Sequence, residues 1–302
     1  KLEQVLRANQ FAITAETSPP DAASADVVLD RVNCLKGVAD AVNVTDGASA
    51  RAHMSALATA AIMVREGIDP VLQLTTRDRN RLALQGDVLG ASALGIHNFL
   101  CLTGDKMTAG DQPDAAEVFD IDSGALMRQM RDMRDLGTYP SGRKINPAPS
   151  LFLGGAEVPT DPDADWSPAR ILAKISNGAQ FFQTQYCFDL GIVERYCHRL
   201  AEEGITEKAY FLIGIGPLAS AKSARWMNDN LFGVHVPDDI IKRLDGADDQ
   251  KAEGRKICAE LLQAFSEIKG CAGAHLMAPR QEAACAQVIR ESGLLQRRNR
   301  GE

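Results

Sequence analysis

The chain has 302 residues, of which 45% are hydrophobic and 24% charged, and its formal net charge is −7. These proportions are typical of a soluble globular protein, and the negative charge argues against a nucleic-acid partner, because phosphates bind best to a basic face. No apolar stretch reaches the roughly 20 residues of a membrane-spanning helix, and no signal segment opens the chain. Seven cysteines without a Cys-x-x-Cys pair indicate reduced thiols. We therefore expect a cytoplasmic protein with no membrane partner.

Eight short apolar or β-branched segments recur along the chain and predict buried strands. They are residues 11–16, 41–45, 70–75, 98–103, 150–154, 181–188, 209–215 and 273–277. Helical patterns separate many of them, at residues 52–66, 79–94, 123–136, 168–177, 191–203 and 253–269. Strands that alternate with helices pair in parallel through right-handed crossovers. Eight such units predict a (β/α)8 TIM barrel, and the absence of a linker-like segment predicts a single domain over residues 1–302.

The active site of such a barrel lies at the carboxyl ends of its strands. The predicted ends carry polar residues: Glu16, Thr45, Asp46, Gln73, Thr75, Thr76, Thr103, Asp105, Gln183, Gln185 and Arg280. A single acid at the end of a strand is more often a capping residue than a catalyst. Because these side chains converge on one face, however, we expect a site for a polar organic ligand. Within it, Gly104 would let a flat ligand approach the backbone, and Asp105 would accept hydrogen bonds from ring N–H groups.

Two patterns suggest other chemistry but are better explained by structure. Gly214-Ile215-Gly216-Pro217 imitates a dinucleotide-binding fingerprint. The fingerprint belongs in a first βαβ unit, whereas this motif follows the seventh strand, so we predict a barrel loop. The five histidines have no spacing suited to a metal site, and none is predicted.

Six motifs, in register with the predicted strands, together resemble the 5,10-methylenetetrahydrofolate reductase family, in its bacterial form with a catalytic barrel alone. They are Glu16, Asn43-Val44-Thr45-Asp46-Gly47, Leu102-Thr103-Gly104-Asp105, Gln183-Thr184-Gln185-Tyr186, Gly214-Ile215-Gly216-Pro217 and His275-Leu276-Met277-Ala278-Pro279-Arg280. No single motif is very specific, but the ordered series extends from residue 11 to about residue 295.

The resemblance implies a barrel that holds FAD, with FMN as an alternative, and that uses NADH or NADPH. The reaction would reduce 5,10-methylenetetrahydrofolate to 5-methyltetrahydrofolate, or run in reverse, in the one-carbon metabolism that supplies methionine. Glu16 matches the general acid that protonates N10, and Asp105 matches the acid beside the flavin and the pterin. Gln185 and Arg280 match substrate-binding positions. The flavin-contact positions are Thr45, Asp46, Ala48, Gln73, Thr103, Gly104, Asp105 and Lys174. A homo-oligomer is also expected.

The chain departs from the family pattern at several binding positions. Gln73 replaces a histidine, Thr103 replaces an arginine, and Ala221 stands where an aromatic residue contacts folate. Arg170 and Ala173 also replace flavin-phosphate contacts beside Lys174. FMN, weaker FAD binding and a different conformation of the flavin tail therefore remain open. Two alternatives are a pterin-binding barrel methyltransferase without flavin and a non-catalytic folate-binding subunit.

Overall fold

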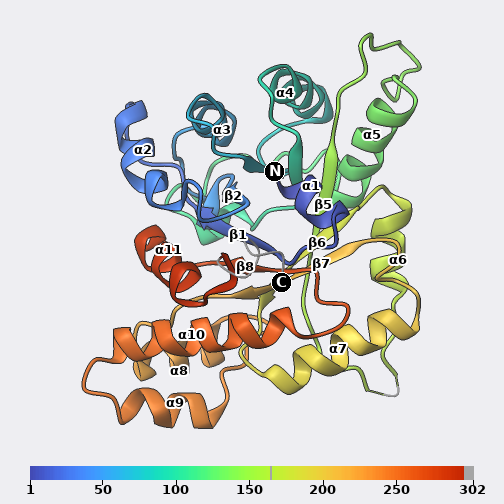
Figure 1. Ribbon diagram of the computed structural model, residues 1–302. Helices are drawn as coiled ribbons and strands as arrows, with labels where there is room; N and C mark the ends of the chain where they lie inside the picture. Colours follow the sequence, from blue (N-terminus) through green and yellow to red (C-terminus); the bar gives the residue numbers. More distant parts are fainter. Residues whose placement is uncertain (164, 296–302) are drawn as a thin grey trace.

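The computed structural model describes residues 1–163 and 165–295. Eight parallel strands pair in sequence order, and β1 also pairs with β8, which closes the sheet into a barrel (Figure 1). The strands are β1 (Ala12–Thr17), β2 (Ala41–Val44), β3 (Pro70–Thr75), β4 (Asn98–Leu102), β5 (Phe152–Glu157), β6 (Phe181–Tyr186), β7 (Tyr210–Ile215) and β8 (Gly273–Leu276). The predicted (β/α)8 TIM barrel is confirmed. Of the predicted domain over residues 1–302, residues 164 and 296–302 lie outside the described residues.

Helices surround the barrel and join its strands. They are α1 (Leu2–Arg7), α2 (Ala25–Val32), α3 (Ala56–Arg65), α4 (Arg81–Ala93), α5 (Ser123–Asp135), α6 (Ala169–Ser176), α7 (Leu190–Glu202), α8 (Ala221–Asn230), α9 (Asp238–Asp245), α10 (Gln250–Ser266) and α11 (Glu282–Glu291), with 3-10 turns η1 (Asn33–Leu35), η2 (Ala48–Ala50) and η3 (Met107–Ala109). Within the described residues, no helix has both the length and the apolar character needed to cross a membrane. The sequence patterns missed α1, α2, α8, α9 and α11. These helices have six to ten residues, and helices this short depend on packing more than on their own propensity.

The prediction for the fifth strand was wrong at its carboxyl end. Residues 150–154 were expected, but β5 continues through Ala156 to Glu157. Gly155 has low β-propensity, so the pattern gave no signal beyond Gly154. Pairing with β6, from Gly154 opposite Phe181 to Glu157 opposite Thr184, holds the strand in place. The predicted loop after the seventh strand is confirmed, because β7 ends at Ile215 and α8 begins only at Ala221.

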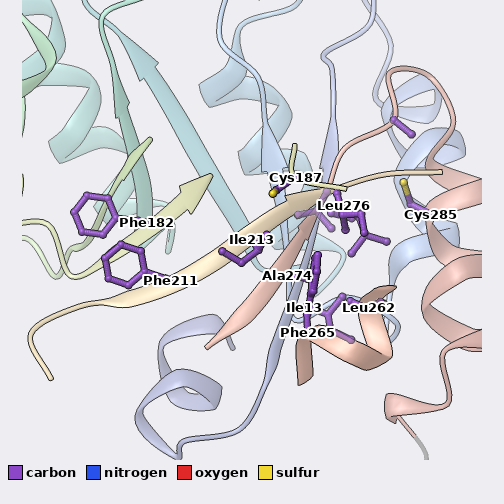
Figure 2. Close-up of a cluster of buried hydrophobic side chains, with 14 of the residues drawn as sticks. Ile13, Phe182, Cys187, Phe211, Ile213, Leu262, Phe265, Ala274, Leu276 and Cys285 are labelled. Carbon is purple, nitrogen blue, oxygen red and sulfur yellow. The ribbon is translucent and has the colours of Figure 1, made fainter. Parts of the chain in front are cut away.

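Most of the hydrophobic core lies between the sheet and the surrounding helices. The stacked rings of Phe182 and Phe211 join β6 to β7, with centroids 4.9 Å apart (Figure 2). Leu262 and Phe265 of α10 belong to the same core cluster as Ile13 of β1 (Figure 2). This layer holds the helices on the outside of the barrel.

A smaller cluster fills the amino-terminal part of the barrel interior. Leu2 and Leu6 of α1 pack against inward-facing residues, namely Ala12, Ala41, Val71, Leu100, Phe152, Phe181 and Leu212. We call this cluster the apolar floor of the barrel. Side chains alternate between the two faces of a strand, so the residues two and four positions after a floor residue also face the interior. On β1 these are Thr14 and Glu16. The apolar floor therefore sets which polar side chains point into the barrel.

Substituting Gly154 with alanine should destabilise the protein, because the added Cβ would lie 2.3 Å from the ring of the buried Phe181. We expect a loss of about 1–3 kcal/mol in the free energy of unfolding, measured by urea denaturation. Gly86→Ala in α4 is the matched control, since the space around Gly86 is open. It should stabilise by about 0.5–1 kcal/mol. Equal effects of the two substitutions would contradict the close packing of β5 on Phe181.

Candidate active site

A layer of polar side chains lies across the barrel above its apolar floor. Asn43 of β2 and Gln183 of β6 form a reciprocal amide pair, in which Asn43 Nδ2 donates to Gln183 Oε1 at 2.6 Å and Gln183 Nε2 donates to Asn43 Oδ1 at 2.9 Å. Gln183 Nε2 also donates to Thr14 Oγ1 at 3.0 Å. Thr14 Oγ1 lies 2.9 Å from His275 Nδ1. All four residues are at most 3% exposed.

Glu16 lies directly above this layer, at the carboxyl end of β1. Its Oε2 accepts a hydrogen bond from Gln73 Nε2 at 2.9 Å, and His275 Nε2 lies 3.6 Å from the same oxygen. In the described part of the chain, Oε1 makes no hydrogen bond with protein. The side chain is 20% exposed, so solvent or a ligand can reach it. One carboxylate oxygen is thus held by the protein, while the other is available to a ligand.

A cavity of about 350 Å³ opens above Glu16. It is lined by Glu16, Gln73, Leu100, Leu102, Ala156, Glu157, Val158, Arg170, Gln183, Thr184, Gln185, His275 and Met277. The small residues of β5 create part of this space, because Gly154 and Ala156 alternate with the outward-facing Gly155 and present little or no side chain to the interior. The volume is in the range of small-molecule sites, and apolar walls with a few polar groups are typical of such sites.

An ion-pair cluster forms the wall of the cavity opposite β1. Glu157 at the end of β5 is 7% exposed, and it pairs with Arg170 and, at 3.1 Å, with Lys174 of α6. The hydrogen bond to Glu157 raises the pKa of Arg170 above its usual value. Lys174 also donates to the carbonyl of Ala156. Lys174, predicted as a flavin contact, is therefore already paired within the protein.

The loops after β2, β3 and β4 are joined by two arginines. Arg77 donates to the carbonyl oxygens of Gly47 at 3.1 Å and Asp105 at 3.2 Å, and it pairs with Asp78 at 2.7 Å. Asp46 accepts hydrogen bonds from the backbone N–H and the hydroxyl of Thr75, at 2.8 and 3.0 Å. Asp46 also pairs with Arg79. This network fixes one side of the rim of the cavity.

The structure brings four of the predicted site residues together in the cavity, Glu16, Gln73, Gln183 and Gln185. Gln183 and Gln185, two positions apart on β6, both line the cavity, although the pairing of β6 with β7 shifts register between Gln183 and Tyr186. Gln183 lies in the buried polar layer, whereas Gln185 is half-buried and its Oε1 accepts from the N–H of Tyr186 at 3.0 Å. Burial, together with the nearby charge of Glu16, raises the pKa of Tyr186, whose hydroxyl donates to the carbonyl of Met277 at 3.0 Å.

The other predicted residues lie around the rim and not in the cavity lining. Thr103 and Asp105 are exposed after β4, and Thr103 Oγ1 donates to Ser123 Oγ at 3.1 Å. Arg280 is exposed after β8. Ala48 is half-buried in η2. Ala221, a predicted departure, is buried at the start of α8.

Sequence reasoning assigned no role to three cavity or polar-layer residues, Asn43, Glu157 and His275. Asn43 and His275 occur in the motifs that carry the family resemblance. The alternation of side chains along β1 would have indicated a polar layer at Thr14, two residues before Glu16. Glu157 was missed because the fifth strand was predicted to end too early. The partners of these residues come from distant strands, which spacing along the chain does not reveal.

Two features of the rim bear on the expected flavin. Thr45 Oγ1 is buried without a hydrogen-bond partner, so a polar ligand atom could pair with it. Gly104 has φ +91°, and a Cβ there would lie 3.2 Å from Thr75 and 3.3 Å from Arg77, so the packing of the protein itself requires this glycine. Lys174, at the expected position of the flavin tail, is engaged by Glu157. Within residues 1–163 and 165–295, no group of three or more His, Cys, Asp or Glu side chains could hold a metal ion.

Sequence comparison relates the whole barrel to one family. A family model described as methylenetetrahydrofolate reductase matches residues 1–293. A probable methylenetetrahydrofolate reductase (NADPH) of Caenorhabditis elegans is 24% identical over 236 residues, which cover 76% of this chain and 33% of the relative. The chain therefore spans about a third of the length of this curated relative.

Solved structures show the same fold at low sequence identity. A protein from Clostridium thermocellum, described as binding two copies of 5-methyl-5,6,7,8-tetrahydrofolic acid, has a TM-score of 0.66 and 13% identity, and the match covers 98% of this chain and 99% of that one. An F420-dependent secondary alcohol dehydrogenase has a TM-score of 0.53 and 12% identity, with coverage of 93% and 99%.

Arg77→Met should destabilise the rim, because it leaves two carbonyl groups and Asp78 without their buried partner. We expect a loss of about 2–4 kcal/mol in the free energy of unfolding, measured by urea denaturation. Arg81→Met is the matched control, since Arg81 pairs with Asp120 at an exposed position and surface pairs contribute little. A near-native stability of the Arg77 variant would show that the rim does not depend on this guanidinium.

Proposed function

The chain belongs to the methylenetetrahydrofolate reductase family, as its motifs predicted, and on that premise we propose that it reduces 5,10-methylenetetrahydrofolate to 5-methyltetrahydrofolate. The proposal includes a flavin, FAD or FMN, and NADH or NADPH as the reductant, and it allows the reverse direction. The observation that carries it is the geometry of Glu16, an acid with one free oxygen in a cavity of ligand size. Seven free cysteines, six of them buried, support a reducing, cytoplasmic setting.

Glu16 would act as the general acid of this reaction. Its Oε2 is occupied by the Gln73 amide and faces His275, so the transferable proton belongs on Oε1, which faces the cavity. Opening the five-membered ring of the folate requires a proton on N10, a weakly basic aryl amine. A positioned carboxylic acid contributes typically 10²–10⁴-fold to such a step. After the transfer, the Gln73 N–H and the facing imidazole stabilise the carboxylate.

The flavin, when bound, supplies the hydride chemistry between the nicotinamide and the one-carbon unit. Thr45, Gly104 and Ala48 would hold its ring at the rim, with Asp105 beside it. The guanidinium of Arg170 is also paired with Glu157, but it is largely exposed and its other N–H groups could bind an anionic group. Gln185 and Arg280 would contact the folate. The protein's part is to orient the two rings and to exclude water.

One observation favours a second candidate, a pterin-binding barrel that uses no flavin. The pairing of Lys174 with Glu157 removes a cation from the position expected for the flavin tail. An absorption spectrum of the purified protein separates the candidates. The visible absorption bands of a bound flavin, with a released cofactor identified by mass, support the reductase. A colourless protein that binds 5-methyltetrahydrofolate and does not take up added FAD or FMN would support the second candidate.

Glu16→Gln should abolish folate reduction while leaving the first half-reaction intact, because the amide has no acidic proton to donate. We expect NAD(P)H oxidation with methylenetetrahydrofolate to fall at least about 100-fold and NAD(P)H oxidation with menadione to stay near wild type. Glu3→Gln, a change at a partly exposed position of α1 outside the cavity, serves as the control. Folate turnover close to wild type in Glu16→Gln would refute the assignment of the general acid.

A further inference from the structure

We propose that Gln183, held by Asn43, is a positioning residue that fixes the tautomer of His275 so that its Nε2–H faces Glu16. The effect of this arrangement on catalysis rests on the proposed function. The arrangement itself rests on the hydrogen bonds of the buried polar layer, and it can be measured without any turnover.

The amide pair restricts the orientation of both side chains. Gln183 and Asn43 exchange two hydrogen bonds, at 2.6 and 2.9 Å. If Gln183 alone turned over, its NH2 group would face the NH2 group of Asn43 and its oxygen would face the oxygen of Asn43. Both contacts are unfavourable in a buried site, where an unpaired polar group costs about 1–3 kcal/mol. The two amides therefore turn together or not at all.

In the orientation that the structure shows, the Gln183 amide presents its N–H edge to Thr14 and His275. Gln183 Nε2 lies 3.0 Å from Thr14 Oγ1 and 3.3 Å from His275 Nδ1. Thr14 Oγ1 accepts from Gln183, and its own hydrogen can go to His275 Nδ1 at 2.9 Å or to the Ala274 carbonyl at 3.4 Å. One N–H of Gln183 is used by Asn43, so its other N–H points between Thr14 Oγ1 and His275 Nδ1. A hydrogen on Nδ1 would meet that N–H, which makes Nδ1 the acceptor. In a neutral imidazole the hydrogen is then on Nε2.

The nearby carboxylate favours the same tautomer. His275 Nε2 lies 3.6 Å from Glu16 Oε2, a distance too long for a formed hydrogen bond but short enough for strong electrostatic interaction. With the hydrogen on Nε2, a positive N–H edge faces the carboxylate. If the amide pair were reversed, Nδ1 would carry the hydrogen and the lone pair of Nε2 would face Oε2. Gln183 therefore acts on Glu16 through His275.

This arrangement has a direct chemical consequence for the proposed acid. Donors from Gln73 and His275 both address Oε2, so the negative charge left after proton transfer is stabilised on that oxygen. The proton to be transferred is confined to Oε1 on the cavity side. The opposite tautomer would oppose ionisation of Glu16 and would compete for its proton.

Gln183→Glu tests the proposal, because it replaces the donating Nε2 by an oxygen with little change in shape. The oxygen that replaces Nε2 faces Thr14 and His275, and it is an acceptor toward both in either protonation state. If the carboxyl group is ionised, this oxygen carries no hydrogen. If it is neutral, the hydrogen on this oxygen is donated to Asn43 Oδ1. We expect long-range 1H–15N correlation spectra near neutral pH to show His275 with its hydrogen on Nε2 in the wild type and on Nδ1 in the variant. A His275→Asn sample identifies the signals among the five histidines.

Two further variants keep the test decisive. Gln85→Glu is the matched control, because Gln85 is a buried glutamine whose amide donates to Gln129 and lies outside the polar layer; it should leave the His275 signals unchanged. If Gln183→Glu does not fold, Asn43→Leu/Gln183→Met removes both amides with similar volume, a change that can be nearly neutral. It should divide His275 between its two tautomers. An Nδ1–H form in the wild type, or an unchanged Nε2–H form in the polar-layer variants, would overturn the proposal.

Kinetics separate this proposal from the proposed function. Gln183→Glu should slow folate reduction by at least roughly tenfold, a part of the full contribution of a general acid, whereas the control Gln85→Glu should leave folate reduction near the wild-type rate. A wild-type protein that reduces no folate would refute the proposed function while the tautomer result still stood. Normal folate turnover in a variant whose tautomer has switched would refute the catalytic role of Gln183 alone.

Discussion

The reciprocal amide pair between Asn43 and Gln183 is the interaction on which the site depends. The two residues come from β2 and β6, which lie on opposite sides of the eight-stranded barrel. Polar side chains inside a closed sheet are costly unless each is satisfied. By pairing across the axis, the amides satisfy each other and leave one N–H for Thr14 and His275. A satisfied network of this kind is rigid, and it supports Glu16 from below.

The alternation of side chains along β1 builds the site in layers. Ala12 belongs to the apolar floor, Thr14 to the polar layer and Glu16 to the cavity. The same alternation on β6 places Phe181 in the floor and Gln183 in the layer above it. The floor excludes water from beneath the polar layer, and the polar layer fixes the carboxylate. Toward the carboxyl ends of the strands, the inward-facing side chains therefore first pack against one another, then form hydrogen bonds, and finally line the cavity.

Much of the fold and part of the site could be predicted from sequence. Eight apolar segments alternating with helical patterns sufficed for the barrel, and the convergence of strand ends on one face placed Glu16 and Gln73 in the cavity lining. Glu157 was missed because Gly155 gives no strand signal, and because pairing with β6 extends β5 beyond its own propensity. The partnership of Asn43 with Gln183 joins residues 140 positions apart. The two side chains meet only because the barrel closes, so patterns of neighbouring residues in the sequence cannot predict this pair.

The contacts of Arg77 have a consequence for the motion of the rim. One guanidinium joins the carbonyl groups of Gly47 and Asp105, so the loops after β2, β3 and β4 form one mechanical unit. Opposite them, the cluster of Glu157 with Arg170 and Lys174 joins β5 only to the neighbouring α6. Because long surface side chains rearrange on a nanosecond timescale whereas joined loops move together more slowly, the two sides of the rim differ in stiffness. We therefore expect a ligand to enter along the β5–α6 side and to settle against the stiffer side that carries Asp46 and Asp105.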